Sequence, residues 1–277
     1  MIAEALREAA RRLAETSDTA RLDAELLMAH ALGVSRSETL LRHMDHDEPE
    51  AFHALVERRA RHEPVAYILG RKEFYGREFL VAPGVLIPRM DSETTVVTAL
   101  DACPAPARVL DCGVGSGALL FTILAERPTA EGVGIDRATE ALATASANAA
   151  LLGLGERAQL LRRDWDEPGW ADDLGRFDLV LANPPYVEEG APIALAVREW
   201  EPAGALFAGA EGLDAYRVLI PQLPPLLTAN GAAVVEIGAA QADAVAGIAA
   251  DTGFTADLRR DLASRPRALI LRLGLGK

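Results

Sequence analysis

The sequence of 277 residues has only two cysteines, Cys103 and Cys112, and no long uninterrupted apolar run. Two thiols cannot build the disulfide framework of a small secreted domain, and neither stands at a spacing typical of a metal cluster. The chain also lacks a segment long enough to span a membrane and an N-terminus in which basic residues precede an apolar stretch. We therefore expect a cytoplasmic protein without membrane contact.

Positive charge is in deficit, with 28 Lys and Arg against 41 Asp and Glu, and most of the net charge of −13 lies after residue 84. A body this acidic is a poor general binder of nucleic acid, because neutralisation of phosphates dominates that affinity. Histidine is confined to the stretch from His30 to His62. These histidines lack acidic or thiol partners at metal-binding spacings, so we expect no metal site.

Residues 1–65 carry apolar side chains at helical spacing, such as Ile2, Leu6 and Leu13. We predict a helical substrate-recognition domain with helices at about 2–16, 20–32, 35–41 and 49–61. Residues 16–19 should supply an N-cap for the second helix, and Gly33 should end it.

The pattern changes after this domain. Residues 67–70 and 77–81 are strand-like and flank Phe74-Tyr75-Gly76, which predicts a β-hairpin. We expect residues 66–84 to form a linking hairpin between the helical domain and the rest of the chain.

Residues 85–277 alternate strands and helices, which predicts an α/β domain built on a doubly wound sheet with helices on both faces. The predicted strands are 108–110, 132–135, 159–161, 177–182, 233–237, 257–258 and 268–271. The predicted helices are 91–100, 117–126, 138–151, 213–228 with a kink at Pro221 or Pro224, and 240–251.

A glycine-rich loop follows the first predicted strand of this domain. Residues 111–117 read Asp-Cys-Gly-Val-Gly-Ser-Gly and open a helix. Glycines there permit a tight turn and let a ligand approach backbone N–H groups at a helix N-terminus. The same letters satisfy a loose dinucleotide fingerprint. The loop alone therefore fits either a nicotinamide cofactor or a nucleoside.

Polar residues follow the next two predicted strands. Asp136 closes the second strand at about the spacing at which a carboxylate grips ribose hydroxyls. Asp164 and Trp165 close the third strand, where the carboxylate could hold an exocyclic amine and the indole could cover an adenine ring. Asp136 could instead cap the next helix, or do both, and Trp165 could be a core residue.

The fourth predicted strand ends in Asn183-Pro184-Pro185-Tyr186, the stretch around which the domain is organised. Proline stiffens the backbone and keeps the residue before it extended, so the carbonyls there are free to accept hydrogen bonds. Asn183 adds a side-chain acceptor and donor, and Tyr186 adds a flat ring with a polar tip. Ligands bind at the carboxyl ends of strands in open α/β sheets. The stretch is typical of a clamp for a planar group that carries an NH₂, although a strand ending in a proline turn would read the same.

The motifs together resemble a known family, the peptide chain release factor glutamine N5-methyltransferases (the PrmC or HemK family). The resemblance covers almost the whole chain and depends on the order of its motifs, because Asn-Pro-Pro-Tyr alone also occurs in DNA adenine methyltransferases. Met90 and Cys112 depart from the residues usual in the family, which are proline and leucine. The matching segments are 63–70, 73–76, 85–89 with Glu93, 111–117, 183–186, 197–202, 205–209 and 211–217.

The resemblance implies a class I, Rossmann-like methyltransferase that uses S-adenosylmethionine to methylate the glutamine of the Gly-Gly-Gln loop in bacterial class 1 release factors. It implies that Asn183, Pro184, Pro185 and Tyr186 hold the glutamine amide. We expect a monomer that binds the release factor directly and binds no nucleic acid. The implied cofactor-binding residues are Asp111, Gly113, Val114, Gly115, Ser116, Gly117, Asp136, Asp164, Trp165 and Asn183.

Four different functions also fit parts of the sequence. The nearest is that of an enzyme that methylates a glutamine of a ribosomal protein, and the second is that of an adenine N6 methyltransferase acting on DNA or RNA. A nicotinamide-dependent oxidoreductase would use Gly113, Gly115 and Ala118 as its fingerprint. A non-catalytic binding module is the fourth, and the full set of expected site residues argues against it.

Overall fold

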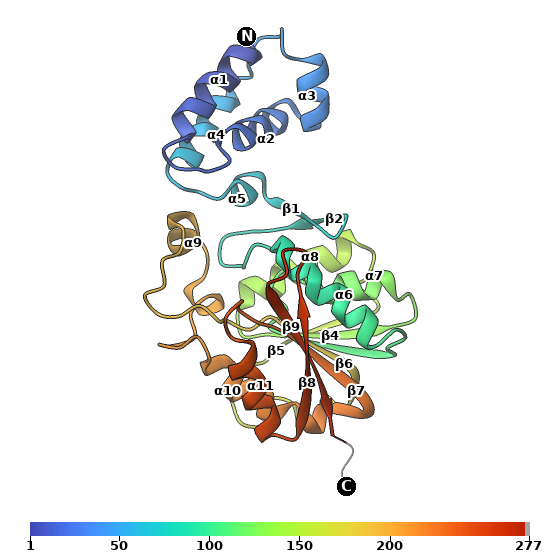
Figure 1. Cartoon of the computed structure of the whole chain (residues 1–277). Helices are drawn as coiled ribbons and strands as arrows, with labels where there is room; N and C mark the ends of the chain where they lie inside the picture. Colours follow the sequence, from blue (N-terminus) through green and yellow to red (C-terminus); the bar gives the residue numbers. More distant parts are fainter. Residues whose placement is uncertain (275–277) are drawn as a thin grey trace. The chain divides into compact units, whose positions relative to one another are not determined.

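The computed structural model describes residues 1–274 and consists of two compact units (Figure 1). The first unit comprises Met1–Lys72 together with Ile193–Glu201. The second comprises Glu73–Pro192 and the described residues from Pro202 onward. The chain therefore crosses between the units at three points. Within residues 1–274, no helix combines the length and apolar composition that crossing a membrane requires.

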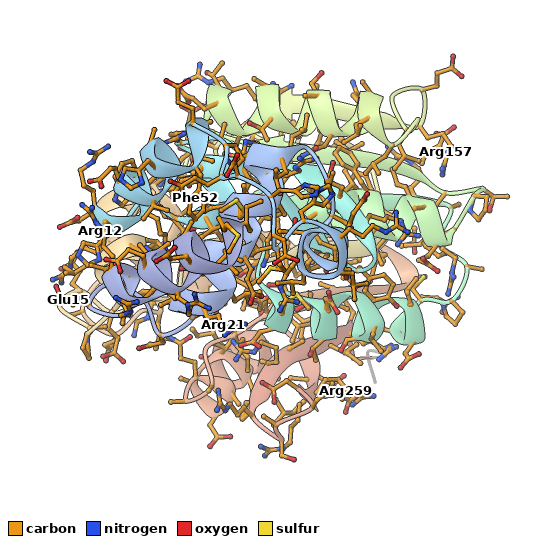
Figure 2. All side chains as sticks on the ribbon, turned by 90° about the horizontal axis from the view of Figure 1, so that it is seen from above. Arg12, Glu15, Arg21, Phe52, Arg157 and Arg259 are labelled. Carbon is orange, nitrogen blue, oxygen red and sulfur yellow. The ribbon has the colours of Figure 1, made fainter. Side chains whose placement is uncertain are left out.

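The first unit is helical and has its own apolar core, in which Ile2, Leu13 and Leu27 are fully buried. Figure 2 shows the charged side chains of Arg12, Glu15 and Arg21 projecting from this unit. The helical predictions for residues 1–65 are confirmed to within three residues at each end. The helices of this unit are α1 (Ile2–Leu13), α2 (Ala20–Leu32), α3 (Arg36–Arg42), α4 (Ala51–Ala60), α5 (Val65–Leu69) and α9 (Leu195–Trp200).

The break before α2 differs from its prediction. Gly33 ends α2 in a left-handed conformation as expected, but Thr19, at the N-cap position, makes no side-chain capping bond. The hydroxyls of Ser17 and Thr19 instead donate to the buried carboxylate of Asp23, at 2.7 and 2.9 Å. Asp23 also accepts a hydrogen bond from Arg59 at 2.7 Å. The polar residues of the break thus help to tie α2 to α4.

The hairpin is shorter than predicted, because residues 65–69 form the helix α5 and not a strand. Pro64 precedes this helix and Gly70 ends it with φ of 71°. Proline before a helix and glycine after it are typical helix boundaries, and here they outweigh the strand-like composition of the residues between them. The hairpin itself is β1 (Arg71–Phe74) and β2 (Arg77–Leu80).

The second unit is built on a seven-stranded sheet in the order β5-β4-β3-β6-β7-β9-β8. β3 to β7 pair in parallel, and β9 pairs antiparallel with both β7 and β8. The doubly wound prediction is confirmed. The strands are β3 (Arg108–Cys112), β4 (Glu131–Asp136), β5 (Ala158–Arg162), β6 (Phe177–Ala182), β7 (Leu227–Glu236), β8 (Phe254–Arg260) and β9 (Pro266–Leu273).

Helices cover both faces of this sheet (Figure 1). One core cluster joins α6 (Glu93–Ala102), α7 (Ala118–Glu126) and α8 (Thr139–Leu151) to the sheet. A second cluster joins α10 (Asp214–Leu219) and α11 (Ala242–Asp251) to the opposite face. Because β4 and β6 flank β3 on its two sides, the strand order reverses at β3. A crevice is expected there at the carboxyl ends of the strands.

Two predictions in this unit were wrong in detail. The helix expected over 213–228 ends at Leu219 and continues as the 3₁₀ turns Ile220–Gln222 and Pro224–Leu226. Three prolines in that stretch lack the N–H that an α-helical ladder needs. The third strand, β5, ends at Arg162, so Asp164 and Trp165 lie in the following loop and do not close the strand.

Candidate active site

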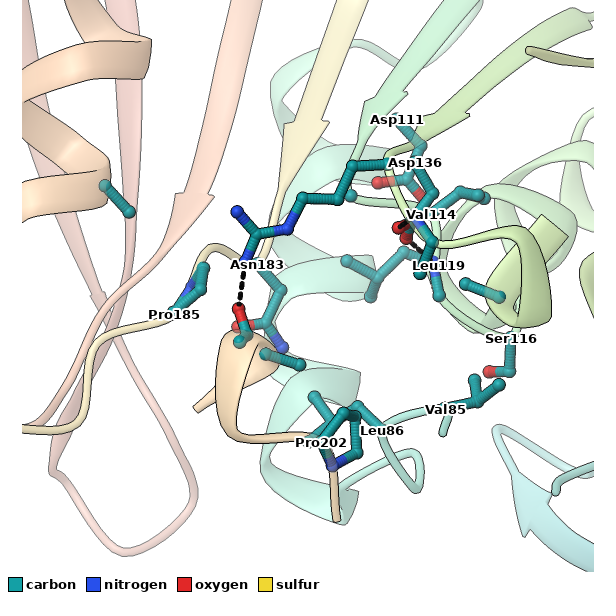
Figure 3. Close-up of a pocket in the computed structure, with 18 of the residues that line it drawn as sticks. Val85, Leu86, Asp111, Val114, Ser116, Leu119, Asp136, Asn183, Pro185 and Pro202 are labelled. Atoms are coloured by element: carbon teal, nitrogen blue, oxygen red, sulfur yellow. Dashed lines mark hydrogen bonds between the residues drawn. The ribbon is translucent and has the colours of Figure 1, made fainter. Parts of the chain in front are cut away.

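A cavity of about 400 Å³ opens at the carboxyl ends of β3, β4 and β6, entirely within the second unit. This volume is in the range of small-molecule sites. Figure 3 shows Asn183 and Pro185 on one side of it and Ser116 on the other. The cavity is lined by nearly all the predicted cofactor residues: Asp111, Gly113, Val114, Gly115, Ser116, Asp136, Asp164, Trp165 and Asn183.

The glycine loop connects β3 to α7 along one wall of the cavity. Gly113, Gly115 and Gly117 all have positive φ, at 81°, 55° and 85°. The amides of Gly113 and Val114 donate to the carbonyl of Ile135 at 2.9 and 2.8 Å. The amide of Gly117 donates to the carbonyl of Val114. The glycines are therefore required by the shape of the turn, and these amides stabilise the loop itself.

Gly117 has the tightest surroundings in this loop, since a Cβ there would lie 2.0 Å from the ring of the buried Phe121. We expect Gly117→Ala to lower the free energy of unfolding by about 2 kcal/mol, from backbone strain and displacement of the ring. Urea denaturation measures this loss. Gly153→Ala is the matched control, because Gly153 has φ of 68° but nothing within 4 Å of its Cβ position. Equal losses in the two variants would show that the Phe121 contact contributes nothing.

Asp111 is the most unusual ionisable group of the cavity. Its side chain is 1% exposed, and Oδ2 accepts a hydrogen bond from the amide of Leu120 at 3.2 Å. Among the described residues, Oδ1 has no hydrogen-bond partner. Burial raises the pKa of Asp111 to about 8, and the nearby Asp136 adds to the rise. A buried carboxyl oxygen without a partner beside a cavity indicates a cationic or hydrogen-donating ligand.

Asp136 ends β4 as predicted and anchors the glycine loop. Its Oδ2 accepts from the amide of Gly115 at 3.0 Å, and its Oδ1 accepts from the amide of Ala138 at 2.9 Å. Burial raises the pKa of Asp136 as well. The N-cap of α8 is Ala138, so Asp136 is not that cap. The carboxylate still faces the cavity, where ribose hydroxyls could donate to it.

Asp164 and Trp165 both line the cavity from the loop after β5. The ring of Trp165 lies against the glycine loop, because a Cβ on Gly113 would be 3.2 Å from it. The same ring packs on the core cluster beneath α10 and α11. Trp165 is thus a partly buried residue that packs against the core and also lines the cavity, and its contact with an adenine ring stays a prediction.

Asn183 follows β6 directly and lines the cavity together with Pro185. Its Nδ2 donates to the hydroxyl of Ser92 at 3.4 Å. Pro184 is buried. Neither Pro184 nor Tyr186 is among the described residues that line the cavity. The structure therefore places Asn183 in the same cavity as the glycine loop, whereas a contribution of Pro184 through its carbonyl stays a prediction.

The outer end of this stretch is fixed by Gln241, which the sequence did not indicate. Its Nε2 donates to the carbonyls of Tyr186 and Gly212, each at 3.1 Å, and its Oε1 accepts from the amide of Gly238 at 3.0 Å. Burial raises the pKa of Tyr186 to about 12, so its phenol stays protonated near neutral pH.

A second missed residue is Glu236, a fully buried carboxyl at the end of β7. The signal that found Asn183, a polar residue where a buried strand ends, applies equally to Glu236.

Within the described chain, no group of three or more His, Cys, Asp or Glu side chains gathers that could hold a metal ion.

The arrangement fits a cationic nucleoside beside a planar amide. Carboxyl groups of Asp111 and Asp136 lie on the glycine-loop side, and an amide with two hydrogen-bonding atoms lies across from the loop (Figure 3). Nothing in this set is a strong base, so the chemistry that it supports is orientation and charge stabilisation.

Comparisons with known proteins agree with this geometry. Residues 4–70 match the family described as "PrmC N-terminal domain", and residues 105–210 match the family described as "Methyltransferase domain". The chain is similar to the release factor glutamine methyltransferase of Cereibacter sphaeroides, with 42% identity over 98% of both chains. It is also similar to that of Geobacter sulfurreducens, with 41% identity over 86% of this chain and 84% of the relative.

Solved structures show the same fold at low sequence identity. A methyltransferase from Pyrococcus furiosus matches with a TM-score of 0.54 and 13% identity, over 73% of this chain and 91% of that one. A ribosomal protein L11 methylase from Lactobacillus delbrueckii matches with a TM-score of 0.50 and 21% identity, over 67% of this chain and 81% of that methylase. These likenesses concern the fold alone.

Proposed function

The chain belongs to the release factor glutamine methyltransferase family, and we propose that it methylates the side-chain amide nitrogen, N5, of the glutamine in the Gly-Gly-Gln motif of class 1 release factors. The methyl donor is S-adenosylmethionine. The observation that carries the proposal is the position of Asn183, which lines one cavity with the glycine loop and the carboxyls of Asp111 and Asp136.

The cavity suits the methyl donor in charge and shape. S-adenosylmethionine supplies a methyl group already activated by a sulfonium, so the protein's own task is binding and orientation. We assign the glycine loop, Asp111 and Asp136 to holding it, with Trp165 as a wall for its flat ring. The unpartnered Oδ1 of Asp111 supports this assignment, because the donor is a cation and a buried carboxylate needs one.

Asn183 and Pro184 would orient the acceptor. An amide nitrogen is a poor nucleophile, because its lone pair is delocalised into the carbonyl. Two acceptors, Oδ1 of Asn183 and the carbonyl of Pro184, can take hydrogen bonds from its two N–H groups and favour the positive charge that develops on nitrogen. Displacement needs nitrogen, methyl carbon and sulfur in line, so positioning supplies much of the rate. We also propose that Tyr186, although it is not among the residues that line the cavity, contacts the plane of the bound amide.

The direct test is to incubate the protein with labelled S-adenosylmethionine and a class 1 release factor, and then to map the methyl group by mass spectrometry. We expect one methyl on the glutamine side chain of the Gly-Gly-Gln motif. A release factor with that glutamine changed to alanine is the control and should stay unlabelled. Label at any other residue, or on a ribosomal protein in preference to the release factor, would overturn the proposal.

Proteins of different classes would bind different ligands. Family membership argues against the nicotinamide-dependent oxidoreductase and the binding module. An adenine N6 methyltransferase would bind DNA or RNA with an affinity that falls steeply with salt. The excess of 41 acidic over 28 basic residues supports a direct protein partner instead.

We propose that the helical unit recognises the release factor, and that residues 1–65, 66–84 and 85–277 act as recognition domain, linker and catalytic domain. The match of residues 4–70 to a separate N-terminal family supports a distinct role for this part. We further propose that the chain acts as a monomer in the cytoplasm, where release factors work.

A further inference from the structure

Glu236 is a buried carboxyl that the proposed chemistry does not use, yet it lies one side chain away from Asn183. It is 0% exposed, and its Oε2 accepts a hydrogen bond from the hydroxyl of Thr95 at 3.1 Å. Among the described residues, its Oε1 has no hydrogen-bond partner. Burying a carboxyl costs free energy unless something is gained by its presence, so this residue needs an explanation.

Ser92 connects Glu236 to the site. Burial raises the pKa of Glu236, and hydrogen bonds from Ser92 and Thr95, with the nearby charge of Arg267, oppose that rise. Ser92 is itself buried, 4% exposed, and accepts from Nδ2 of Asn183 at 3.4 Å. Side chains from η1 (Met90–Ser92), the end of β6 and the end of β7 therefore meet at Ser92, which accepts from Asn183 and is close enough to Glu236 to lower the pKa of that carboxyl.

Counting protons shows which group donates and which accepts in the contacts between Glu236, Ser92 and Asn183. A serine hydroxyl has one proton to donate, and an ionised carboxylate can only accept. When Ser92 gives its proton to Glu236, only lone pairs remain for Asn183. Asn183 must then present its NH₂ to Ser92 and turn its Oδ1 the other way. An asparagine amide is nearly symmetric in shape, so without such a partner either end could face the cavity.

We propose that Glu236 and Ser92 are positioning residues that fix the orientation of the Asn183 amide, so that its oxygen and not its nitrogen faces the acceptor glutamine. This inference rests on the proposed role of Asn183. An amide turned the wrong way would present a donor to a substrate NH₂, which is also a donor. The relay from Glu236 through Ser92 to Asn183 thus selects the one orientation in which the clamp can accept a hydrogen bond.

The test is a set of variants assayed on release factor under single-turnover conditions. We expect Ser92→Ala to lower the methylation rate by about 30-fold, as loss of an orienting partner commonly does. Glu236→Gln should cause a smaller loss, because a glutamine amide can either accept from Ser92 or donate to it and so no longer forces the direction of the bond. The affinity for S-adenosylhomocysteine and the thermal midpoint should stay near wild type. Thr95→Val is the matched control, because it removes the second hydroxyl on Glu236 without touching Asn183, and it should keep most of the rate.

A double-mutant cycle separates positioning from general damage. If Ser92 acts through Asn183, then Ser92→Ala should cause no further loss in an Asn183→Ala background. Additive losses would contradict the proposal, and so would a full rate in Ser92→Ala or a loss in Thr95→Val equal to that in Glu236→Gln.

A spectroscopic measurement reads the relay without any substrate, and so remains decisive if release factor proves not to be the acceptor. In protein labelled with ¹⁵N-asparagine, the side-chain NH₂ signals of Asn183 are assigned by their loss in Asn183→Ala. We expect these signals to move in Ser92→Ala and Glu236→Gln and to stay in place in Thr95→Val. Unmoved signals in Ser92→Ala would overturn the relay, whatever the substrate.

Discussion

Asn183→Ala is expected to lower the methylation rate by about 10³-fold while leaving the cofactor site formed. The substitution removes the side-chain acceptor that we assign to the substrate amide, and preorganised hydrogen-bonding groups of this kind are worth about 10² to 10³ in rate. Loss of the fixed orientation adds to the effect. Single-turnover assays with release factor measure the rate.

Binding should survive this change. Asn183 bonds to Ser92 and not to the glycine loop, so the affinity for S-adenosylhomocysteine should change by no more than a few-fold. Isothermal titration gives that affinity, and a thermal melt checks the fold. A variant that turns over at a near-normal rate would refute the clamp. A variant that loses rate only because it no longer binds the cofactor would assign Asn183 to the donor instead.

Asp111→Asn is expected to change two pH dependences at once. In the folded protein the pKa of Asp111 is about 8, against an ordinary value of 3.8. Between these values the unfolded chain is ionised at this position and the folded protein is not, so stability falls as pH rises from about 4 to about 8. Asparagine does not titrate. The variant should therefore lose this decline and be more stable than wild type at pH 9, by on the order of 5 kcal/mol, since one pKa unit corresponds to about 1.4 kcal/mol and the two pKa values are about four units apart.

The affinity for the methyl donor should change in the opposite sense. A cationic ligand favours the ionised carboxylate, so its binding to wild type should strengthen as pH rises towards 8. The asparagine variant should bind S-adenosylmethionine about 100-fold more weakly at pH 8.5, with a smaller difference at pH 6. Taking the ratio of wild-type to variant affinity at each pH cancels the titration of the ligand's own amino group. If wild type and Asp111→Asn gave parallel pH profiles of stability, and also parallel pH profiles of affinity, Asp111 would not titrate in this range.

Much of the fold could be predicted because most of its helices and strands have recognisable local sequence patterns. Apolar periodicity marks α1, α2 and α4, and short apolar runs followed by polar residues mark β3, β4 and β6. The errors occur where local signals compete. Pro64 and Gly70 make a helix of residues that resemble a strand, and prolines break a helix whose apolar pattern continues through Leu223 and Leu226.

The cavity residues could be predicted from their place at strand ends, but the supports behind them could not. Ser92, Asn183 and Glu236 are far apart in the sequence. The pairing of β6 with β7 brings Asn183 and Glu236 together, and the turn η1 places Ser92 beside Asn183. A carboxyl at the end of a strand can face a ligand, solvent or another side chain, and the sequence does not distinguish these cases. The conformation of each glycine in the loop after β3 could not be predicted either, because a left-handed φ is a property of the folded loop.

The path of the chain has a consequence for how the protein can be divided. Ile193–Glu201, which carries α9, belongs to the helical unit although it lies between Tyr186 and Gly212 in the sequence. The N-terminal family match ends at residue 70 and leaves this insert out. A single cleavage at Lys72 would therefore not yield two complete parts, because α9 would remain attached to the catalytic fragment without its partner helices. For the same reason, a gene fusion with a single junction at Lys72 could not replace the whole helical unit by that of another protein.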